Sequence, residues 1–322
     1  MTLAWLHQLR YPILNASMAG AAGGRLAGAV SRAGGLGTIG FGPAATAESV
    51  ATECARVGGV GFGAGLMVWA VRDNPEVFAA LLTERPVVLS LSFGDPAGLV
   101  ATAQDAGVSV CSQVGTLAEA ERALDAGVDF LVARGSEGGG HGRGEVATLP
   151  LLQQLLEFSP VPVLAAGGIA TARGVAAVLA AGAVGAWVGT PFIACKESDA
   201  GDTVKRAVVE ADSASTVYTR AFDIAQRTPW PAEYGGRALA NDFTDVWADR
   251  LPDLQATVDA DDVLTTSMNE ARRTDNLSIA PVYAGQSVGL VPRIRSAAEV
   301  VSDLSGYAEF LNAASARFGH IE

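Results

Sequence analysis

Short apolar runs alternate with alanine-rich segments of helical periodicity between residues 13 and 188, and this alternation limits the possible folds more than any other feature. A strand, a crossover helix and a further strand give parallel pairing. The predicted strands span residues 13–16, 36–40, 60–64, 87–91, 108–112, 130–133, 161–165 and 185–188. Eight such units in a row predict an α/β fold of the (β/α)8 type, the TIM barrel.

An Ala-Gly pair precedes several of these runs, at Gly34, Gly107, Gly127 and Gly182. Glycine ends a helix readily there because it adopts a left-handed conformation without steric cost. Thr116, followed three residues later by Glu119, has the spacing of a capping box. These signals predict helices such as 117–126 and 172–181.

The character of the chain changes after Pro191, because residues 196–275 are polar and keep helical periodicity. We expect a smaller, mostly helical second domain at 201–282 that covers the substrate, and a barrel built from 1–200 and 283–322. A return loop is expected at 283–290 and a closing helix at 297–318. Pocket walls could come from Trp230, Trp247 and Tyr283, although ordinary domain packing uses the same residue types.

The formal net charge is −12, with 22 Lys and Arg against 34 Asp and Glu. Nucleic-acid affinity comes from clustered basic residues, and the sequence has no such cluster, so we expect no nucleic-acid partner. The acidic run at 259–262 is interpreted as a solvated face, with an acidic metal site as the alternative. No metal is expected.

Three widely spaced cysteines, Cys54, Cys111 and Cys195, form no metal or redox motif. They predict reduced, buried thiols in a cytoplasmic protein. The uncharged run at 174–195 is long enough to span a bilayer, but glycines and Pro191 divide it into a helix, a turn and a strand. We therefore expect neither a membrane segment nor a signal peptide.

Two glycine turns follow the last two predicted strands, Gly167 with Gly168 and Gly189 with Thr190. Loops at these positions of a barrel commonly bind phosphate through backbone N–H groups and a helix N-terminus. The Thr190 hydroxyl could add a donor. Because both turns occur together, we predict a phosphate site, the alternative being two plain tight turns.

A glycine-rich loop follows the sixth strand at 134–142 and carries three successive glycines before His141. Such glycines pack poorly and are costly to order, so a ligand lying against the backbone explains them best. A histidine among glycines at the catalytic face of a barrel is suited to hold a proton or a substrate oxygen. We predict His141 as the catalytic residue.

Two further positions are candidates at strand ends, Met18 and Gln113. Methionine is more often a core residue than a cofactor contact. Gln113 could hydrogen-bond the edge of a heteroaromatic ring, although a surface glutamine would look the same. From these residue types alone, both assignments stay open.

The ordered motifs resemble those of the nitronate monooxygenase family, formerly called 2-nitropropane dioxygenase. The matching segments lie at 11–13, 18–20, 33–37, 135–141, 166–169 and 189–192, with 284–286 resembling the family's late loop. This resemblance implies FMN as the cofactor, and a small-molecule substrate and O2 as partners. A homodimer is compatible with it.

By the same resemblance, Gly167, Gly168, Gly189 and Thr190 would hold the FMN phosphate. Met18, Gln113 and Gly139 would lie along the ring and ribityl chain, with Arg134 and Val188 as further cofactor contacts. Alkyl nitronates would be oxidised with O2 to carbonyl compounds and nitrite, and His141 would be the active-site histidine.

Two positions depart from the family pattern. Arg134 stands where the family commonly has glutamine, and Gly65 where it commonly has asparagine. Both family residues would contact FMN, so its polar anchoring is expected to differ here. Arg134 could instead stabilise negative charge on the reduced flavin.

Two other functions compete with this one. One is an FMN-dependent enoyl-acyl-carrier-protein reductase using NAD(P)H, which also has Gly-Gly-His followed by Gly-Glu and a threonine. Gly144, Glu145 and Thr148 resemble this pattern, with one extra residue after His141. The second alternative is a flavin-free barrel that binds a phosphate ligand, as an isomerase, a lyase or a non-catalytic protein.

Overall fold

Eight parallel strands form one sheet in the computed structural model, which describes residues 4–318. The order across the sheet is β1-β9-β8-β6-β5-β4-β3-β2. The strands are β1 (Ile13–Asn15), β2 (Thr38–Gly40), β3 (Gly63–Met67), β4 (Val88–Ser92), β5 (Ser109–Val114), β6 (Phe130–Arg134), β8 (Val163–Ala166) and β9 (Ala186–Val188). All eight predicted strands are therefore present.

The sheet closes on itself between its first and last strands. Leu14 of β1 bridges Leu36, and the Leu36 amide donates to the Ile13 carbonyl at 3.0 Å, directly before β2. The predicted (β/α)8 barrel is confirmed, and the carboxyl ends of its strands meet at one face.

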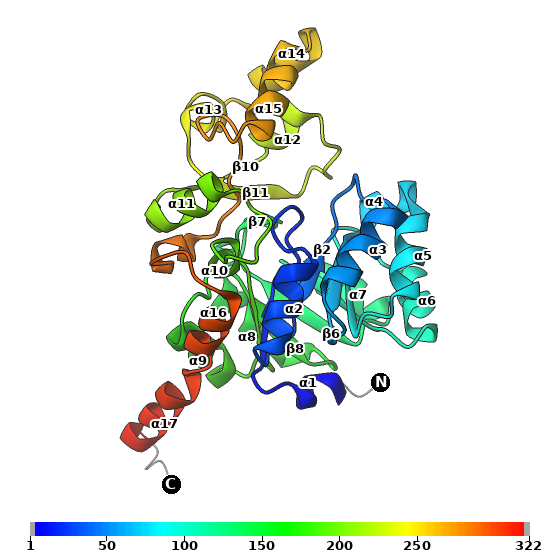
Figure 1. Ribbon diagram of the computed structural model, residues 1–322, viewed down its shortest axis with the longest axis vertical. Coiled ribbons are helices and arrows are strands. Elements are labelled where there is room, and N and C mark those ends of the chain that lie inside the picture. Colours follow the sequence, from blue (N-terminus) through cyan, green and yellow to red (C-terminus); the bar gives the residue numbers. More distant parts are fainter. Residues whose placement is uncertain (1–3, 319–322) are drawn as a thin grey trace.

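Helices pack around the barrel and cover the outer side of its strands (Figure 1). They are α2 (Gly24–Arg32), α3 (Ala47–Arg56), α4 (Val68–Asp73), α5 (Pro75–Thr83), α6 (Leu99–Asp105), α7 (Leu117–Asp125), α8 (Thr148–Phe158), α9 (Ala172–Ala180), α10 (Thr190–Ile193) and α16 (Ala297–Leu304). Helix α1 (Ala4–Gln8) lies at the opposite end of the barrel from the carboxyl face, where Trp5 packs against Phe130.

Glycine turns join several of these helices to the following strands. Gly34, Gly107, Gly127 and Gly182 all have positive φ, between 82° and 106°. The Thr116 side chain caps α7 by accepting from the Glu119 amide, but Glu119 does not complete the capping box. Its carboxylate accepts instead from the Gly115 amide and from Arg143.

Two predicted boundaries were wrong. The third strand begins at Gly63 rather than at residue 60, because Gly58 and Gly59 both have positive φ and lengthen the turn before it. The closing helix is two helices, α16 and α17 (Tyr307–Phe318), separated at Ser305 and Gly306.

Residues after α10 form a second lobe above the carboxyl face of the barrel (Figure 1). Its elements are α11 (Asp202–Glu210), β10 (Thr216–Thr219), α12 (Ala221–Gln226), β11 (Gly235–Leu239), α13 (Asp242–Trp247), α14 (Leu251–Ala260) and α15 (Val263–Arg273). The lobe is mostly helical, as predicted, and has a core of its own around Phe222, Leu254 and Met268. Its two strands were not predicted.

The two lobes share a small antiparallel sheet of order β10-β11-β7. Strand β7 (Gly140–Gly142) belongs to the glycine-rich loop of the barrel. The expected return loop contains the 3-10 helix η1 (Gln286–Leu290) and leads the chain back to the barrel. Domain limits at residues 200 and 283 stay a prediction.

All three cysteines are free and buried, as predicted. Burial raises the pKa of each thiol to about 12, so they are protonated at neutral pH. The uncharged run at 174–195 is divided among α9, β9 and α10. Within residues 4–318, no helix is long and apolar enough to cross a membrane.

Close packing of α2 against the barrel predicts the effect of one substitution. A Cβ atom on Gly37 would lie 1.7 Å from the Ala27 carbonyl oxygen, whereas one on Gly61 would meet only Val87, at 3.6 Å. We expect Gly37→Ala to lower the free energy of unfolding by at least about 2 kcal/mol, because backbone has to move. Gly61→Ala is the matched control, and equal unfolding midpoints in urea for the two variants would contradict this packing.

Candidate active site

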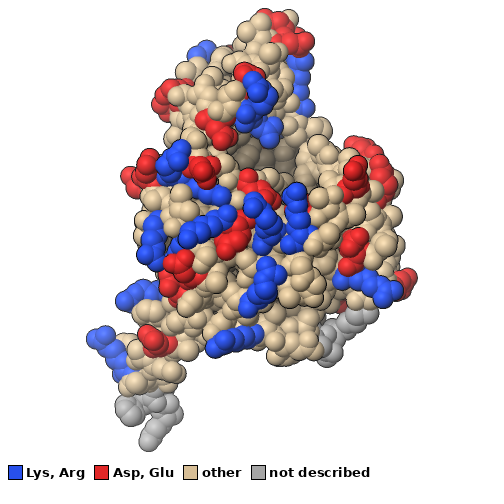
Figure 2. All heavy atoms as spheres, in the orientation of Figure 1, with Lys and Arg blue, Asp and Glu red and all other residues tan. Residues whose placement is uncertain are grey.

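A pocket of about 580 Å³ opens at the carboxyl face of the barrel, beneath the second lobe. Figure 2 shows the molecule hollowed between the upper lobe and the barrel. The volume lies within the range of small-molecule sites. Most of the site residues predicted from the sequence line it, namely Met18, Gln113, Arg134, Gly139, His141, Gly167, Gly168, Gly189 and Thr190.

Val188 differs from the other predicted site residues. It does not line the pocket, because its side chain is buried in the core between strands and helices. Its carbonyl accepts a hydrogen bond from the Ala16 amide at 2.7 Å and so holds β9 against the end of β1.

The turn after β8 brings two glycines to the wall of the pocket. Gly167 and Gly168 have φ values of 101° and 71°, which glycine adopts without strain. Their amides donate to no described residue. Helix α9 begins just beyond them, so its N-terminal end also faces this turn.

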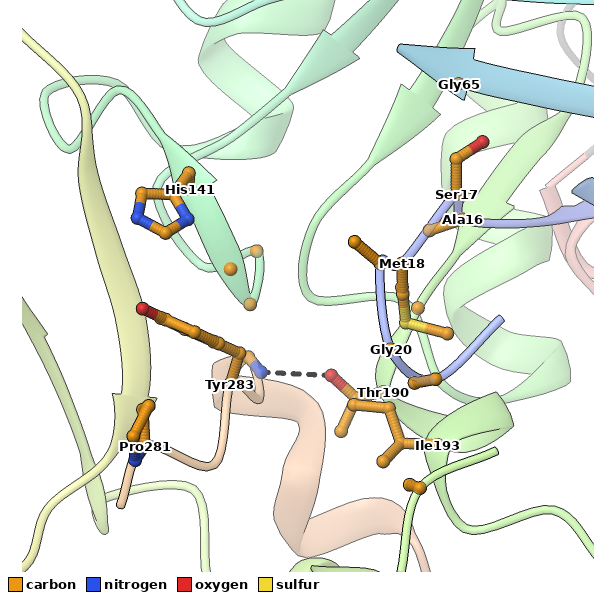
Figure 3. Close-up of a pocket in the computed structure, with 18 of the residues that line it drawn as sticks. Ala16, Ser17, Met18, Gly20, Gly65, His141, Thr190, Ile193, Pro281 and Tyr283 are labelled. Carbon is orange, nitrogen blue, oxygen red and sulfur yellow. Dashed lines mark hydrogen bonds between the residues drawn. The ribbon is translucent and has the colours of Figure 1, made fainter. Parts of the chain in front are cut away.

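Thr190 completes the same end of the pocket. Its hydroxyl oxygen accepts from the Gly285 amide at 2.9 Å, which leaves the hydroxyl hydrogen free to donate (Figure 3). Gly189 lies beside Met18, since a Cβ atom on Gly189 would be 3.5 Å from the Met18 sulfur. The two predicted turns thus meet at one site.

Gln113 stands at the end of β5 on the other side of the pocket. The backbone N–H of Gln113 donates to the Ser92 hydroxyl at 2.9 Å. The side-chain carboxamide forms no hydrogen bond with any described residue. Because a carboxamide carries both donors and an acceptor, this side chain can meet the polar edge of a ring.

Arg134 is almost fully buried beneath the glycine-rich loop. Its Nη2 donates to the carbonyls of Gly138, Gly139 and Gly140, at 2.8, 3.1 and 2.8 Å. Burial lowers the pKa of its guanidinium to about 10, so it stays charged at neutral pH. The arginine therefore fixes the loop from below and keeps a positive charge at the pocket.

His141 sits on β7, where it pairs with Gly236 of β11. Its Nε2 lies 2.8 Å from Oδ1 of Asp223, a buried residue of α12. The imidazole stacks on Trp230 with ring centroids 3.8 Å apart and planes 6° apart, and Tyr283 lies 5.1 Å away at a tilt. One loop residue of the barrel is thus held by Asp223 and Trp230 of the opposite lobe and by Tyr283 of the return segment.

Tyr283 belongs to the same buried group. Burial, and then the nearby Asp223 carboxylate, raise the pKa of its phenol well above the usual range. Tyr283 is therefore neutral at neutral pH and can act as a hydrogen-bonding group or a wall.

Aromatic residues form the wall beyond His141. Trp230 lies 5.1 Å from Phe93 and 5.2 Å from Trp69, in edge-to-face arrangements. Of the three predicted wall residues, Trp230 and Tyr283 line the pocket. Trp247 does not; it packs on the helical core of the second lobe and under Arg250.

Asp223, Phe93 and Arg272 are among the pocket residues that were not predicted from the sequence. Asp223 is 82 residues from His141 in the chain and belongs to no motif. Phe93 has a positive φ of 66°, and its place directly after the fourth apolar run was a usable signal. Arg272 belongs to a segment of helical periodicity, α15, and this periodicity does not indicate that its side chain reaches the pocket.

A closed barrel with glycine turns after β8 and β9, and a histidine in the same pocket, is typical of an enzyme site. Residues 67–306 match the family model described as nitronate monooxygenase. The chain belongs to the nitronate monooxygenase family, whose members are in general flavin-dependent.

Individual relatives agree with this assignment. Nitronate monooxygenase from Paraburkholderia phytofirmans is 34% identical over 72% of this chain, which spans only 63% of that relative's length. FabK from Thermotoga maritima has a TM-score of 0.82 at 28% identity, covering 98% of both chains. Nitroalkane oxidase from Streptomyces ansochromogenes has a TM-score of 0.81 at 28% identity, covering 97% of this chain and 99% of its own.

The contacts of Arg134 predict what a lysine would do in its place. An ammonium is a compact charge and cannot reach the same set of carbonyls as a guanidinium, so Arg134→Lys should loosen the loop. We expect amide hydrogen exchange at residues 138–142 to accelerate at least about tenfold, the equivalent of about 1.4 kcal/mol. Arg122→Lys on exposed α7 is the control; unchanged exchange in both variants would show that the clamp is unimportant.

Proposed function

We propose that this protein is an FMN-dependent oxidoreductase that oxidises alkyl nitronates with O2 to carbonyl compounds and nitrite. The observation that carries the proposal is the placement of His141, held by the second lobe in one pocket with the anion turn of Gly167 and Gly168. Membership in the nitronate monooxygenase family supports the reaction.

The pocket fits FMN at both ends. The unpaired amides of Gly167 and Gly168, with the Thr190 hydroxyl, would hold the phosphate. The unpaired carboxamide of Gln113 would meet the ring edge, while Met18 and Gly139 would lie along the ring and ribityl chain. When bound, FMN supplies the redox chemistry by taking electrons from the substrate and passing them to O2.

The residues of the chain would bind and orient the substrate beside this cofactor. Phe93, Trp230 and Tyr283 give the pocket an apolar side for an alkyl group and keep water away from it. In its protonated form, His141 would donate a hydrogen bond from Nδ1 to the nitro oxygens of a nitronate. For a neutral nitroalkane it would also take the proton from the α-carbon.

Arg134 is the chain's main departure from the family pattern at this site. We propose that its buried positive charge also stabilises negative charge in the bound flavin, because no carboxylate forms a hydrogen bond with it in residues 4–318. The other departure from the family pattern is Gly65, which has no side chain to contact a flavin. A Cβ atom at Gly65 would lie only 2.5 Å from Ser17, so a larger residue would require a shift there.

The likeness to FabK favours a second candidate, the enoyl-acyl-carrier-protein reductase. Of the residues that suggested it, Thr148 has a structural role, because its hydroxyl contacts Glu137 and the Gly167 carbonyl and ties the two site loops together. Gly144 and Glu145 do not line the pocket. Thr148 therefore does not discriminate between the two reactions.

Location and assembly remain part of the proposal. Free, buried cysteines support a cytoplasmic protein. A homodimer is compatible with membership in the family. On the face in Figure 2, basic side chains are interspersed with acidic ones, and we continue to expect no nucleic-acid partner.

Oxygen uptake tests the proposed reaction directly. FMN-loaded protein should consume O2 with alkyl nitronates and with propionate 3-nitronate. With neutral nitroalkanes, His141→Ala should keep the flavin while losing at least about 100-fold in turnover, as is usual when a proton-handling group is removed. Flavin absorbance and an oxygen electrode give both readouts.

The rival functions have separate signatures. Rapid NADH oxidation with a crotonyl thioester, and no oxygen uptake with nitronates, would replace the proposal with the reductase. If the protein takes up no flavin even after incubation with FMN, the remaining alternative is a flavin-free barrel that binds a phosphate ligand.

A further inference from the structure

We propose that Asp223 is a positioning residue that fixes the protonation pattern of His141. Its carboxylate keeps a proton on Nε2 of the imidazole and leaves Nδ1 as the ring nitrogen that meets the substrate. The consequence for catalysis rests on the proposed function, whereas the placement of the proton does not.

The contact between the two side chains is buried and short. Nε2 of His141 and Oδ1 of Asp223 are 2.8 Å apart, and the side chains are only 11% and 4% exposed. The other carboxylate oxygen, Oδ2, is buried and has no hydrogen-bond partner among the described residues. The imidazole is therefore the one group that compensates this carboxylate by hydrogen bonding.

The position of the shared proton follows from ordinary basicity. An ionised carboxylate can only accept hydrogen bonds, and imidazole is normally a stronger base than a carboxylate. The proton therefore belongs on Nε2, with Asp223 as the acceptor. A neutral His141 then carries its lone pair on Nδ1.

The ring is also held against rotation. Trp230 stacks on one face of the imidazole, with ring centroids 3.8 Å apart. The Tyr283 ring lies at a tilt, with its centroid 5.1 Å from that of the imidazole. Turning the ring over to exchange its nitrogens would break the Asp223 contact. Figure 3 shows the imidazole with its free nitrogen on the side of the pocket where Met18 lies, and no described residue forms a hydrogen bond with that atom.

Such an arrangement makes Nδ1 an oriented proton acceptor. When a neutral nitroalkane gives up its α-proton to Nδ1, the C–H electron pair stays on the substrate as the nitronate anion, and the imidazolium formed is compensated by Asp223. Other charged or titratable groups near this pair are Tyr283 from the return segment and Arg272 at the end of α15. A substrate supplied as the nitronate skips the proton transfer and depends less on Asp223.

We expect Asp223→Asn to lose far more activity with nitroethane than with ethyl nitronate. An asparagine side chain can accept from Nε2 or donate to it, so the Nδ1 lone pair is no longer assured. In FMN-loaded enzyme we expect kcat/KM for nitroethane to fall at least about 100-fold, and for ethyl nitronate less than about tenfold, since removal of such an acidic partner costs up to about 10⁴-fold elsewhere. Asp223→Glu should recover part of the nitroethane activity.

A matched control is Asp245→Asn, an exposed carboxylate of the same lobe on α13, which should leave both activities unchanged. Equal losses with nitroethane and ethyl nitronate in Asp223→Asn would overturn the catalytic part of the inference. Circular dichroism and bound flavin report whether that variant is folded.

Proton placement has a readout independent of activity. The chain has 3 histidines, so comparison with His141→Phe assigns the His141 signals in a ¹H–¹⁵N correlation spectrum. At a pH where the imidazole is neutral, wild-type protein should show the Nε2–H tautomer, and Asp223→Asn should lose this preference. The Nδ1–H tautomer in wild-type protein would overturn the inference. Failure to oxidise nitronates, with the expected tautomer, would refute only the proposed function.

Discussion

Pairing of β7 with β11 is the interaction on which the site depends. Strand β7 consists of Gly140, His141 and Gly142, which have no apolar side chain to pack. Glycine loses more backbone freedom on ordering than other residues, so this segment would be poorly defined without partners. Antiparallel hydrogen bonds to β11 hold it from above.

Two side chains reinforce this pairing from opposite sides. Arg134 bonds the loop carbonyls from inside the barrel, and the Tyr218 hydroxyl joins the Gly142 carbonyl to the Gly235 amide, at 2.8 Å each. His141 is therefore a residue of the barrel whose orientation is set by the second lobe. A change in either lobe should reach the chemistry through this small sheet.

Much of the barrel and part of the site could be predicted from the sequence because both rest on local patterns. Period and spacing gave the eight strands, and glycines at strand ends gave the turn at Gly167 and Gly168. Strand β11 was missed because Gly235 and Gly236 do not look like a strand; they are required because larger side chains would meet Tyr218 and Tyr283. Asp223 was missed because its role exists only across the interface between the lobes.

We propose that the carboxyl face of the barrel binds FMN through its phosphate. Titration of the flavin-free protein with FMN and with riboflavin, followed by flavin fluorescence, tests this most directly. Because Gly167, Gly168 and Thr190 offer donors that only the phosphate can use, FMN should bind at least about 100-fold more tightly, the equivalent of about 2.7 kcal/mol. Equal affinity for FMN and riboflavin, or no binding of either, would contradict a phosphate-binding site at this face.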